Sequence, residues 1–140
     1  MKIDANFLEN LSDDLKKIVL DASEAIMQVY KKNTFNTEIK SDGSPVTEAD
    51  ENANKIIIQS LNIISPDIFI VSEETYEKSA ETPQDPYWLV DPLDGTKEFI
   101  NRSNDFTVNI ALIEKGSPIY GIICAPVTGQ IWSGSSFQKS

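Results

Sequence analysis

Two aspartates lie three residues apart where an apolar segment of the sequence ends. Residues 87–90 read Tyr-Trp-Leu-Val without polar alternation, and Asp91 follows them directly. Such a run is typical of a strand that is buried on both faces. Pro92 fixes φ and removes a backbone donor, so regular strand pairing should stop there, and Asp94-Gly95 is a turn dipeptide. We therefore expect both aspartates to project from a rigid turn at the end of a buried strand.

The oxygen atoms of this segment suit a hard divalent cation. Mg²⁺ takes oxygen ligands in octahedral geometry and usually keeps water and substrate phosphate in its shell, so one or two carboxylates per ion suffice. A carboxylate that bridges two such ions gives a two-metal site for cleaving phosphate esters. Thr96 adds a hydroxyl, and a short helix over residues 97–100 would offer backbone N–H groups to an anion. The alternative for this motif alone is an acidic turn that closes a strand.

The composition of the chain excludes several classes of function. Its 140 residues suffice for one domain with a hydrophobic core, and 22 acidic against 12 basic residues give a net charge of −10. A general nucleic-acid binder needs a basic patch, so we expect no nucleic acid as a partner and a small anionic substrate only where cations mediate the contact. The chain contains no histidine, which excludes an imidazole base and His-ligated zinc within these residues.

Cysteine usage and hydropathy indicate the compartment. Cys124 is the sole cysteine, so an intrachain disulfide is excluded, which suits a reducing cytosol. The N-terminus lacks the apolar core of a signal peptide, and no apolar run approaches the length that spans a membrane. These observations predict a cytoplasmic protein without a transmembrane segment.

A long amphipathic helix is predicted near the N-terminus. Its apolar positions recur at spacings of three and four, and they are Leu8, Leu11, Leu15, Ile18, Ala22, Ala25, Ile26 and Val29. Ser12 is a candidate N-cap, with acidic residues following it in the first turn. An alternative is that the helix begins earlier, near Asp4. In either case we expect it to be a structural helix that faces the core.

A second helix should begin near Thr47. Thr47-x-x-Asp50 has the spacing of a capping box, and apolar residues over 49–64 fit helical spacing. Asp50 could satisfy the helix dipole, or it could bind a metal ion or a water, and spacing alone favours the structural role. Before this helix, residues 37–40 should form a short strand and residues 41–45 a loop.

The remainder of the chain is predicted to consist mainly of strands. They lie over residues 67–72, 106–113, 118–125 and 131–134, and the second and third of them form an antiparallel hairpin. The first ends in Glu73-Glu74, so carboxylates again follow a buried strand. Residues 78–86 are polar and contain two prolines, which indicates an exposed loop. Trp88 and Trp132 are expected to be core residues.

Three motifs in order resemble those of one enzyme family. They are residues 40–50, 71–74 and 88–99. Together they resemble the inositol monophosphatase superfamily, and Asp91–Phe99, with Lys97-Glu98 inside it, resembles its bacterial 3′(2′),5′-bisphosphate nucleotidases of the CysQ type. The resemblance extends from Lys40 to Pro126, and residues 25–30 of the first helix also fit. Three ordered motifs are far more specific than one.

The resemblance implies a fold and a set of metal ligands. The fold would be α+β, with two helices packed on an antiparallel sheet. Glu73, Asp91 and the backbone carbonyl of Leu93 would hold a first Mg²⁺. Asp91 would bridge to a second ion, which Asp94 would also hold.

The resemblance also implies catalytic and substrate-binding roles. Asp50 and Thr96 would orient the attacking water, with Asp50 near a third, weaker metal position, and Glu73 would take part in catalysis through its metal. The backbone N–H groups of Gly95 and Thr96 would meet the phosphate. Lys97-Glu98 marks the subfamily, and we expect these two side chains to be exposed.

The activity that the resemblance implies is a Mg²⁺-dependent phosphatase reaction that belongs to sulfur metabolism and is inhibited by Li⁺. Water would attack in line and remove the 3′-phosphate of 3′-phosphoadenosine 5′-phosphate, giving AMP and phosphate without a covalent enzyme intermediate. The alternatives are a phosphatase for inositol phosphate or another sugar phosphate, and a catalytically dead fragment that binds metal or a partner.

Family members continue beyond the segment that these residues resemble. Their second half carries a Trp-Asp motif, whose aspartate completes the second metal site, and supplies most nucleotide contacts. Residues 1–140 thus resemble the N-terminal metal-binding domain, without the C-terminal domain. We expect the surface that the C-terminal half would cover to favour self-association.

Overall fold

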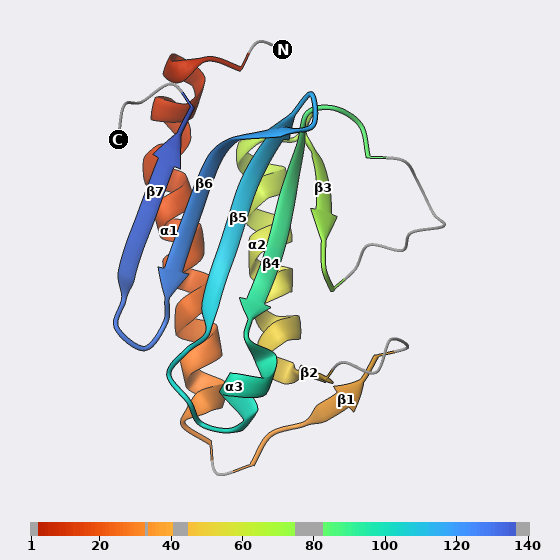
Figure 1. The fold of residues 1–140 in the computed structure, drawn as a ribbon, viewed down its shortest axis with the longest axis vertical. Coiled ribbons are helices and arrows are strands. Elements are labelled where there is room, and N and C mark those ends of the chain that lie inside the picture. Colours follow the sequence, from red (N-terminus) through yellow and green to blue (C-terminus); the bar gives the residue numbers. More distant parts are fainter. Residues whose placement is uncertain (1–2, 33, 41–44, 75–82, 137–140) are drawn as a thin grey trace.

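A computed structural model describes residues 3–32, 34–40, 45–74 and 83–136. In it, two helices cover one face of a five-stranded sheet (Figure 1). α1 (Ala5–Tyr30) and α2 (Glu48–Ile64) pack against each other, α1 also against β6 and α2 against β4. The strands of this sheet, in spatial order, are β3 (Phe69–Ser72), β4 (Tyr87–Asp94), β5 (Thr107–Glu114), β6 (Ser117–Ala125) and β7 (Gln130–Ser135). The predicted α+β fold is confirmed.

The sheet is antiparallel except at one edge. β4, β5, β6 and β7 pair antiparallel with their neighbours, and the predicted hairpin of β5 and β6 is confirmed. β3 instead runs parallel to β4, with Phe69 opposite Tyr87. Parallel neighbours require a long connection, which residues 73–86 supply. Because of this parallel pairing, β3 and β4 end at the same edge of the sheet, and the acidic residues that follow each strand lie near one another.

α1 begins at the earlier of the two predicted positions. Asp4 is the N-cap, and its carboxylate accepts a hydrogen bond from the N–H of Phe7 at 2.9 Å. An aspartate in this position satisfies one of the helix donors that have no intrahelical partner. Ser12 therefore lies inside the helix, and the alternative start at that residue is wrong. The predicted apolar face does pack into the core, with Leu15, Ala22 and Ile26 fully buried.

α2 begins as its capping box predicts. Thr47 is the N-cap, and its backbone N–H donates to Asp50 Oδ2 at 2.9 Å. Thr47 also belongs to a strand that the sequence did not indicate, β2 (Pro45–Thr47), which pairs antiparallel with β1 (Thr37–Ile39). The predicted strand over 37–40 is confirmed, whereas most of the predicted loop over 41–45 lies outside the described residues. So does most of the predicted loop over 78–86.

β4 departs from its prediction in two ways. Its burial alternates, because Trp88 and Val90 face the helices whereas Leu89, 39% exposed, faces the other side. Burial on both faces is therefore wrong for the described part of the chain, since α1 and α2 cover one face only. The strand also continues through Pro92 to Asp94. Pairing changes register between Asp91 and Asp94, which is a β-bulge rather than an end.

The two tryptophans differ in environment. Trp88 is fully buried, as predicted, and its indole Nε1–H donates to Ser65 Oγ at 2.9 Å. Trp132 on β7 is 53% exposed, so its prediction as a core residue is wrong. It pairs across strands with Ile123, which is also exposed, on the face of the sheet away from the helices. No helix of the described residues is both long and apolar enough to cross a membrane.

Candidate metal centre

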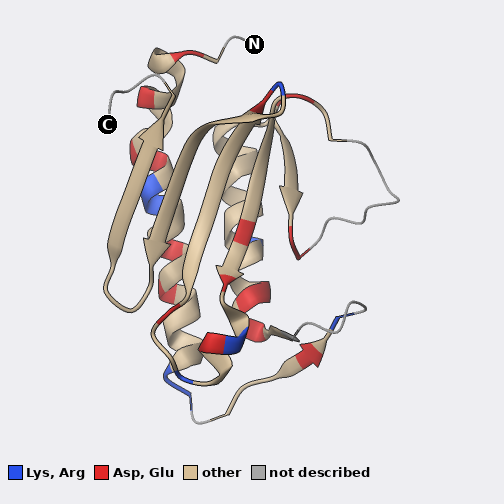
Figure 2. Cartoon of the chain, in the orientation of Figure 1, with Lys and Arg blue, Asp and Glu red and all other residues tan. Residues whose placement is uncertain are grey.

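Acidic residues lie at the edge of the sheet where β3 and β4 end (Figure 2). Several of them line a cavity there. The cavity has a volume of about 270 Å³. Its lining comprises Lys40, Glu73, Glu74, Asp91, Leu93, Asp94, Gly95, Thr96, Lys97 and Glu98. Five carboxylates thus face two lysine ammonium groups, which makes the cavity negative and attractive to cations. Every metal ligand predicted from the sequence lies on this lining.

The bulge in β4 places Asp91 and Asp94 on the same cavity. Asp91 is half-buried, and its pKa is raised to about 6, first by burial and then by repulsion from the carboxylates of Asp94 and Glu73. The backbone N–H of Leu93 donates to Asp91 and partly opposes this rise in pKa. A cation beside Asp91 would favour its ionised form, so this carboxylate is well suited to a metal site.

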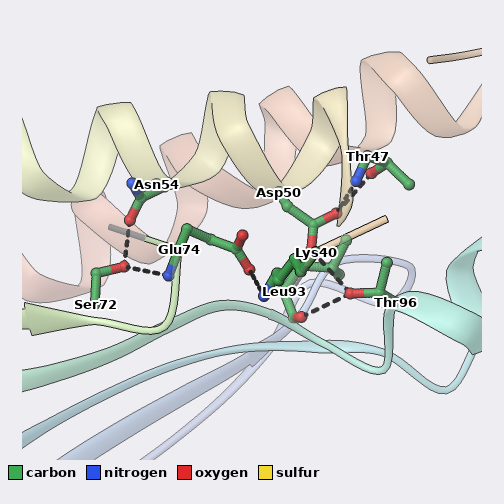
Figure 3. Close-up of polar contacts among 8 residues, drawn as sticks. All are labelled: Lys40, Thr47, Asp50, Asn54, Ser72, Glu74, Leu93 and Thr96. Carbon is green, nitrogen blue, oxygen red and sulfur yellow. Dashed lines mark hydrogen bonds and ion pairs between the residues drawn. The ribbon is translucent and has the colours of Figure 1, made fainter. Parts of the chain in front are cut away.

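Asp50 and Thr96 are in direct contact (Figure 3), and Thr96 lines this cavity. Thr96 Oγ1 donates to Asp50 Oδ1 at 2.8 Å, and the other oxygen of Asp50 accepts from the backbone N–H and the hydroxyl of Thr47. Asp50 is fully buried. Its carboxylate therefore caps α2 with one oxygen and holds Thr96 with the other. Asp50 can therefore cap the helix and also contribute to the site, so the two alternatives predicted for it are compatible.

Gly95 holds the turn between β4 and α3 (Thr96–Ile100). Its φ of 94° lies in the left-handed region, and a Cβ there would meet the carbonyl oxygen of Asp105 at 2.8 Å. A residue other than glycine would be strained and would clash. The predicted turn and short helix are confirmed, and Phe99 anchors α3 in the core. Lys97 and Glu98 are exposed, as predicted.

An ion pair closes one side of the cavity. Lys40 Nζ lies 3.0 Å from Glu74 Oε1, which joins the segment after β1 to the turn after β3. Burial raises the pKa of Glu74, whereas the hydrogen bond from Lys40 lowers it. The sequence placed both residues within motifs but assigned neither a role. Their pairing joins segments more than thirty residues apart, and no local signal predicts it.

The donor atoms of the cavity fit a hard cation, but its acidic side chains do not surround one position. Carboxylates together with the Leu93 carbonyl form an all-oxygen set, as Mg²⁺ requires. Yet within the described ranges no three acidic or cysteine side chains stand close enough to hold one ion. Like charges repel, which opposes such convergence. Binding at this site would therefore involve rotation of side chains within the shared cavity.

Two buried polar residues next to this cavity were not anticipated. Ser72, the last residue of β3, donates through Oγ to Asn54 Oδ1 of α2. Asn54 lies four residues after Asp50, on the same side of the helix. A polar residue among the buried positions of an amphipathic helix is the signal that could have identified it.

The fold and the site together define a class: an α+β protein with an acidic, oxygen-lined site where two parallel strands end. Residues 8–140, which are nearly the whole chain, match the Inositol monophosphatase family, and the chain belongs to that family.

Several proteins to which the chain is similar are bisphosphate nucleotidases. The 3′(2′),5′-bisphosphate nucleotidase CysQ of Buchnera aphidicola is 43% identical over 91% of this chain and 49% of its own length. The CysQ of Shigella flexneri is 46% identical over 88% of this chain and 51% of its own length. The crystal structure of CysQ from Bacteroides thetaiotaomicron is 37% identical, with a TM-score of 0.72, over 89% of this chain and 46% of that one. The chain thus spans about half the length of the curated relatives that it matches.

Proposed function

We propose that this chain forms the metal-binding part of a 3′(2′),5′-bisphosphate nucleotidase. The reaction is hydrolysis of the 3′-phosphate of 3′-phosphoadenosine 5′-phosphate to AMP and phosphate. The observation that carries the proposal is the contact of Thr96 with the buried Asp50 beside a cavity lined by carboxylates. Similarity to CysQ proteins at 43–46% identity supports the choice of a nucleotide as substrate.

Different residues at the cavity are proposed to orient the attacking water and to bind the phosphate. Thr96 directs its hydroxyl hydrogen to Asp50, so its oxygen keeps lone pairs that accept a hydrogen bond from the attacking water. Asp50 holds this hydroxyl in place because its second oxygen is fixed by Thr47. The N–H groups of Gly95 and Thr96 are proposed to donate to the phosphate. Residues 1–140 contain no histidine, so within them these oxygen groups are the ones proposed to orient the water.

Mg²⁺ is the proposed metal because all the available donors are oxygens. Glu73, Asp91 and the Leu93 carbonyl would hold one ion, and Asp91 and Asp94 would share a second. Bound Mg²⁺ lowers the pKa of a coordinated water and neutralises charge on a phosphoryl group. We place the protein in the cytoplasm because its lone cysteine suits a reducing compartment. We place it in sulfur metabolism because the resemblance to bisphosphate nucleotidases implies that role.

Phosphate release by the full-length gene product tests the proposed function. Release from 3′-phosphoadenosine 5′-phosphate should require Mg²⁺ and should exceed release from inositol 1-phosphate assayed side by side. Greater turnover of the inositol phosphate would assign the chain to the sugar phosphatases of the family. No Mg²⁺-dependent release from either substrate would refute a phosphatase and favour a binding fragment.

Lithium provides a second test of the same activity. Li⁺ should inhibit phosphate release, and raising Mg²⁺ should relieve the inhibition if the two cations compete for the acidic cavity. The measurement is the initial rate over a matrix of Li⁺ and Mg²⁺ concentrations, with K⁺ at matched ionic strength as the control. Activity that is indifferent to Li⁺ would indicate a more distant kind of phosphatase.

Self-association is the proposed behaviour of the 140-residue chain in isolation. Leu89, Ile123 and Trp132 are exposed around an apolar hollow of about 450 Å³ on the face of the sheet away from the helices. Exposed apolar surface of this kind favours association with a second copy. In sedimentation, Trp132→Ser should weaken association, whereas Ile63→Ser, which removes an exposed isoleucine from α2, should not. A wild-type chain that stays monomeric at high concentration would contradict this proposal.

A further inference from the structure

A buried hydrogen-bonded pair lies directly behind the candidate metal centre. Ser72 Oγ donates to Asn54 Oδ1 at 2.5 Å and accepts from the backbone N–H of Glu74 at 3.3 Å (Figure 3). Both side chains of the pair are buried. Neither lines the acidic cavity, whereas Glu73 and Glu74, the next residues along the chain from Ser72, both do. The pair can therefore influence the cavity through the backbone that follows β3.

The backbone is held on both sides of Glu73, and the pair supplies one of the two hydrogen bonds that hold it. The N–H of Glu73 donates to the carbonyl oxygen of Val90 at 3.0 Å, which ties it to the residue that precedes Asp91. The next N–H, that of Glu74, is held by Ser72, and Ser72 is in turn held by Asn54. Two hydrogen bonds thus restrain the φ and ψ angles of Glu73. Those angles set the direction in which its side chain leaves the backbone.

One face of α2 contacts both segments that carry the acidic residues, the one after β3 and the one after β4. Asp50 binds Thr96 in the turn after β4, and Asn54, one helical turn further on, binds Ser72 at the end of β3. The helix therefore sets the separation of the two segments that carry Glu73 and Asp91. Without the second anchor, the turn after β3 would keep its backbone bond to Val90 but lose its connection to α2.

We propose that Asn54 and Ser72 are positioning residues that aim the carboxylate of Glu73 at the metal centre. The inference rests on the proposed function, because it takes Glu73 as a metal ligand. Partners behind a ligand commonly alter metal affinity about 10–100-fold when they are removed. The pair is expected to act in this way, through the backbone of Glu73, while the ligands themselves remain in place.

Ser72→Ala and Asn54→Ala test the pair, and Ser65→Ala is the matched control. Ser65 is also buried beside α2 and also makes two hydrogen bonds, to Leu61 O at 2.8 Å and from Trp88 Nε1, but at the opposite end of the helix. All three variants should lower the melting temperature. Only Ser72→Ala and Asn54→Ala should weaken Mg²⁺ binding, by about tenfold or more, in calorimetric titrations of the full-length gene product. Ser72→Thr retains the hydroxyl and should keep the wild-type affinity, and Asn54→Ala carries the test if Ser72→Ala does not fold.

The possible outcomes separate this inference from the proposed function. Mg²⁺ affinity unchanged in Ser72→Ala and Asn54→Ala, in a protein whose wild type binds Mg²⁺, would overturn the positioning role alone. An equal loss of affinity in Ser65→Ala would also overturn it, because the effect would then follow from lower stability. A wild-type protein that binds no Mg²⁺ would refute the metal centre itself, and the inference with it. A loss of Mg²⁺ affinity in Ser72→Ala and Asn54→Ala, with wild-type affinity in Ser72→Thr and Ser65→Ala, would establish the positioning role.

Discussion

The two ends of α2 differ in the groups that they contact: neutral groups at the C-terminal end and carboxylates at the N-terminal end. At the C-terminal end, Ser65 bonds to the backbone of Leu61 and to the indole of Trp88, so buried neutral groups satisfy one another. At the N-terminal end, the buried carboxylate of Asp50 bonds to Thr96 beside a cavity that gathers five more carboxylates. One helix therefore joins a conventional core to a region in which like charges are held together.

The C-terminal end of α2 stabilises the fold, whereas the carboxylates near its N-terminal end destabilise the fold and serve the proposed metal site. Burial of a large aromatic side chain with its polar atom satisfied stabilises the folded state. Confinement of carboxylates in a partly buried cavity destabilises it, as the raised pKa of Asp91 records. The same confinement creates the potential that attracts a cation. Removing the buried Trp88 and removing the Asp91 carboxylate should therefore change stability in opposite directions, and only the change at Asp91 should weaken metal binding.

The largest effect on stability should come from the core end. Trp88→Ala removes a fully buried indole and leaves Ser65 without one partner, so it should lower the free energy of unfolding by about 3–5 kcal/mol. Mg²⁺ affinity of the molecules that remain folded should be unchanged. Urea unfolding and calorimetric titration measure the two quantities. A matching loss of Mg²⁺ affinity would show that the two ends are not independent.

The next largest effect should be on metal affinity at the acidic end. Asp91→Asn should weaken Mg²⁺ binding more than Asp94→Asn, because Asp91 is proposed to contact two ions and Asp94 one. We expect the loss in Asp91→Asn to exceed the about 100-fold that removal of an outer partner can cause. Titration of both variants of the full-length gene product makes the comparison, with Asp13→Asn on the exposed side of α1 as the control. Equal losses would remove the bridging assignment.

The smallest effect should be a gain in stability from Asp91→Asn. The pKa of Asp91 is about 6 in the folded protein against an ordinary value of 3.8, so the folded state binds more protons between these values. Stability should therefore fall as pH rises through this window, and the full penalty should be present above about pH 6. Asp91→Asn should unfold at a higher temperature than wild type at neutral pH in chelator, by an amount equivalent to about 1 kcal/mol, because solvent screens a half-exposed group.

The sign of this difference, and its disappearance in acid, identify its origin. Well below pH 3.8 the wild-type carboxyl is protonated in both states, and the two melting temperatures should converge. Asp13→Asn, measured alongside, should not reproduce the pattern. A variant less stable than wild type at neutral pH would mean that Asp91 stabilises the fold, which would remove the contrast between the two ends of α2.

Local signals in the sequence determined the elements and the residues of the site. The capping box at Thr47, the turn at Gly95 and the apolar periodicity of α1 each depend on neighbours a few residues away, and each was predicted. The strands β3, β5, β6 and β7 lie within two residues of their predicted bounds. Three ordered motifs indicated the family, and the residues they identified as metal ligands line one cavity.

Contacts between distant residues decided the rest. The parallel pairing of β3 with β4 brings Glu73 and Asp91 to one edge, and nothing within either strand specifies its neighbour. Leu89 and Trp132 have apolar side chains that predict burial, but each faces the side of the sheet that α1 and α2 do not cover. The bond of Ser72 to Asn54 likewise spans eighteen residues and exists only once α2 has packed on the sheet. Local sequence thus determined what most segments form, although it did not indicate β2. Packing determined which segments meet, because burial and pairing are properties of the assembled layers.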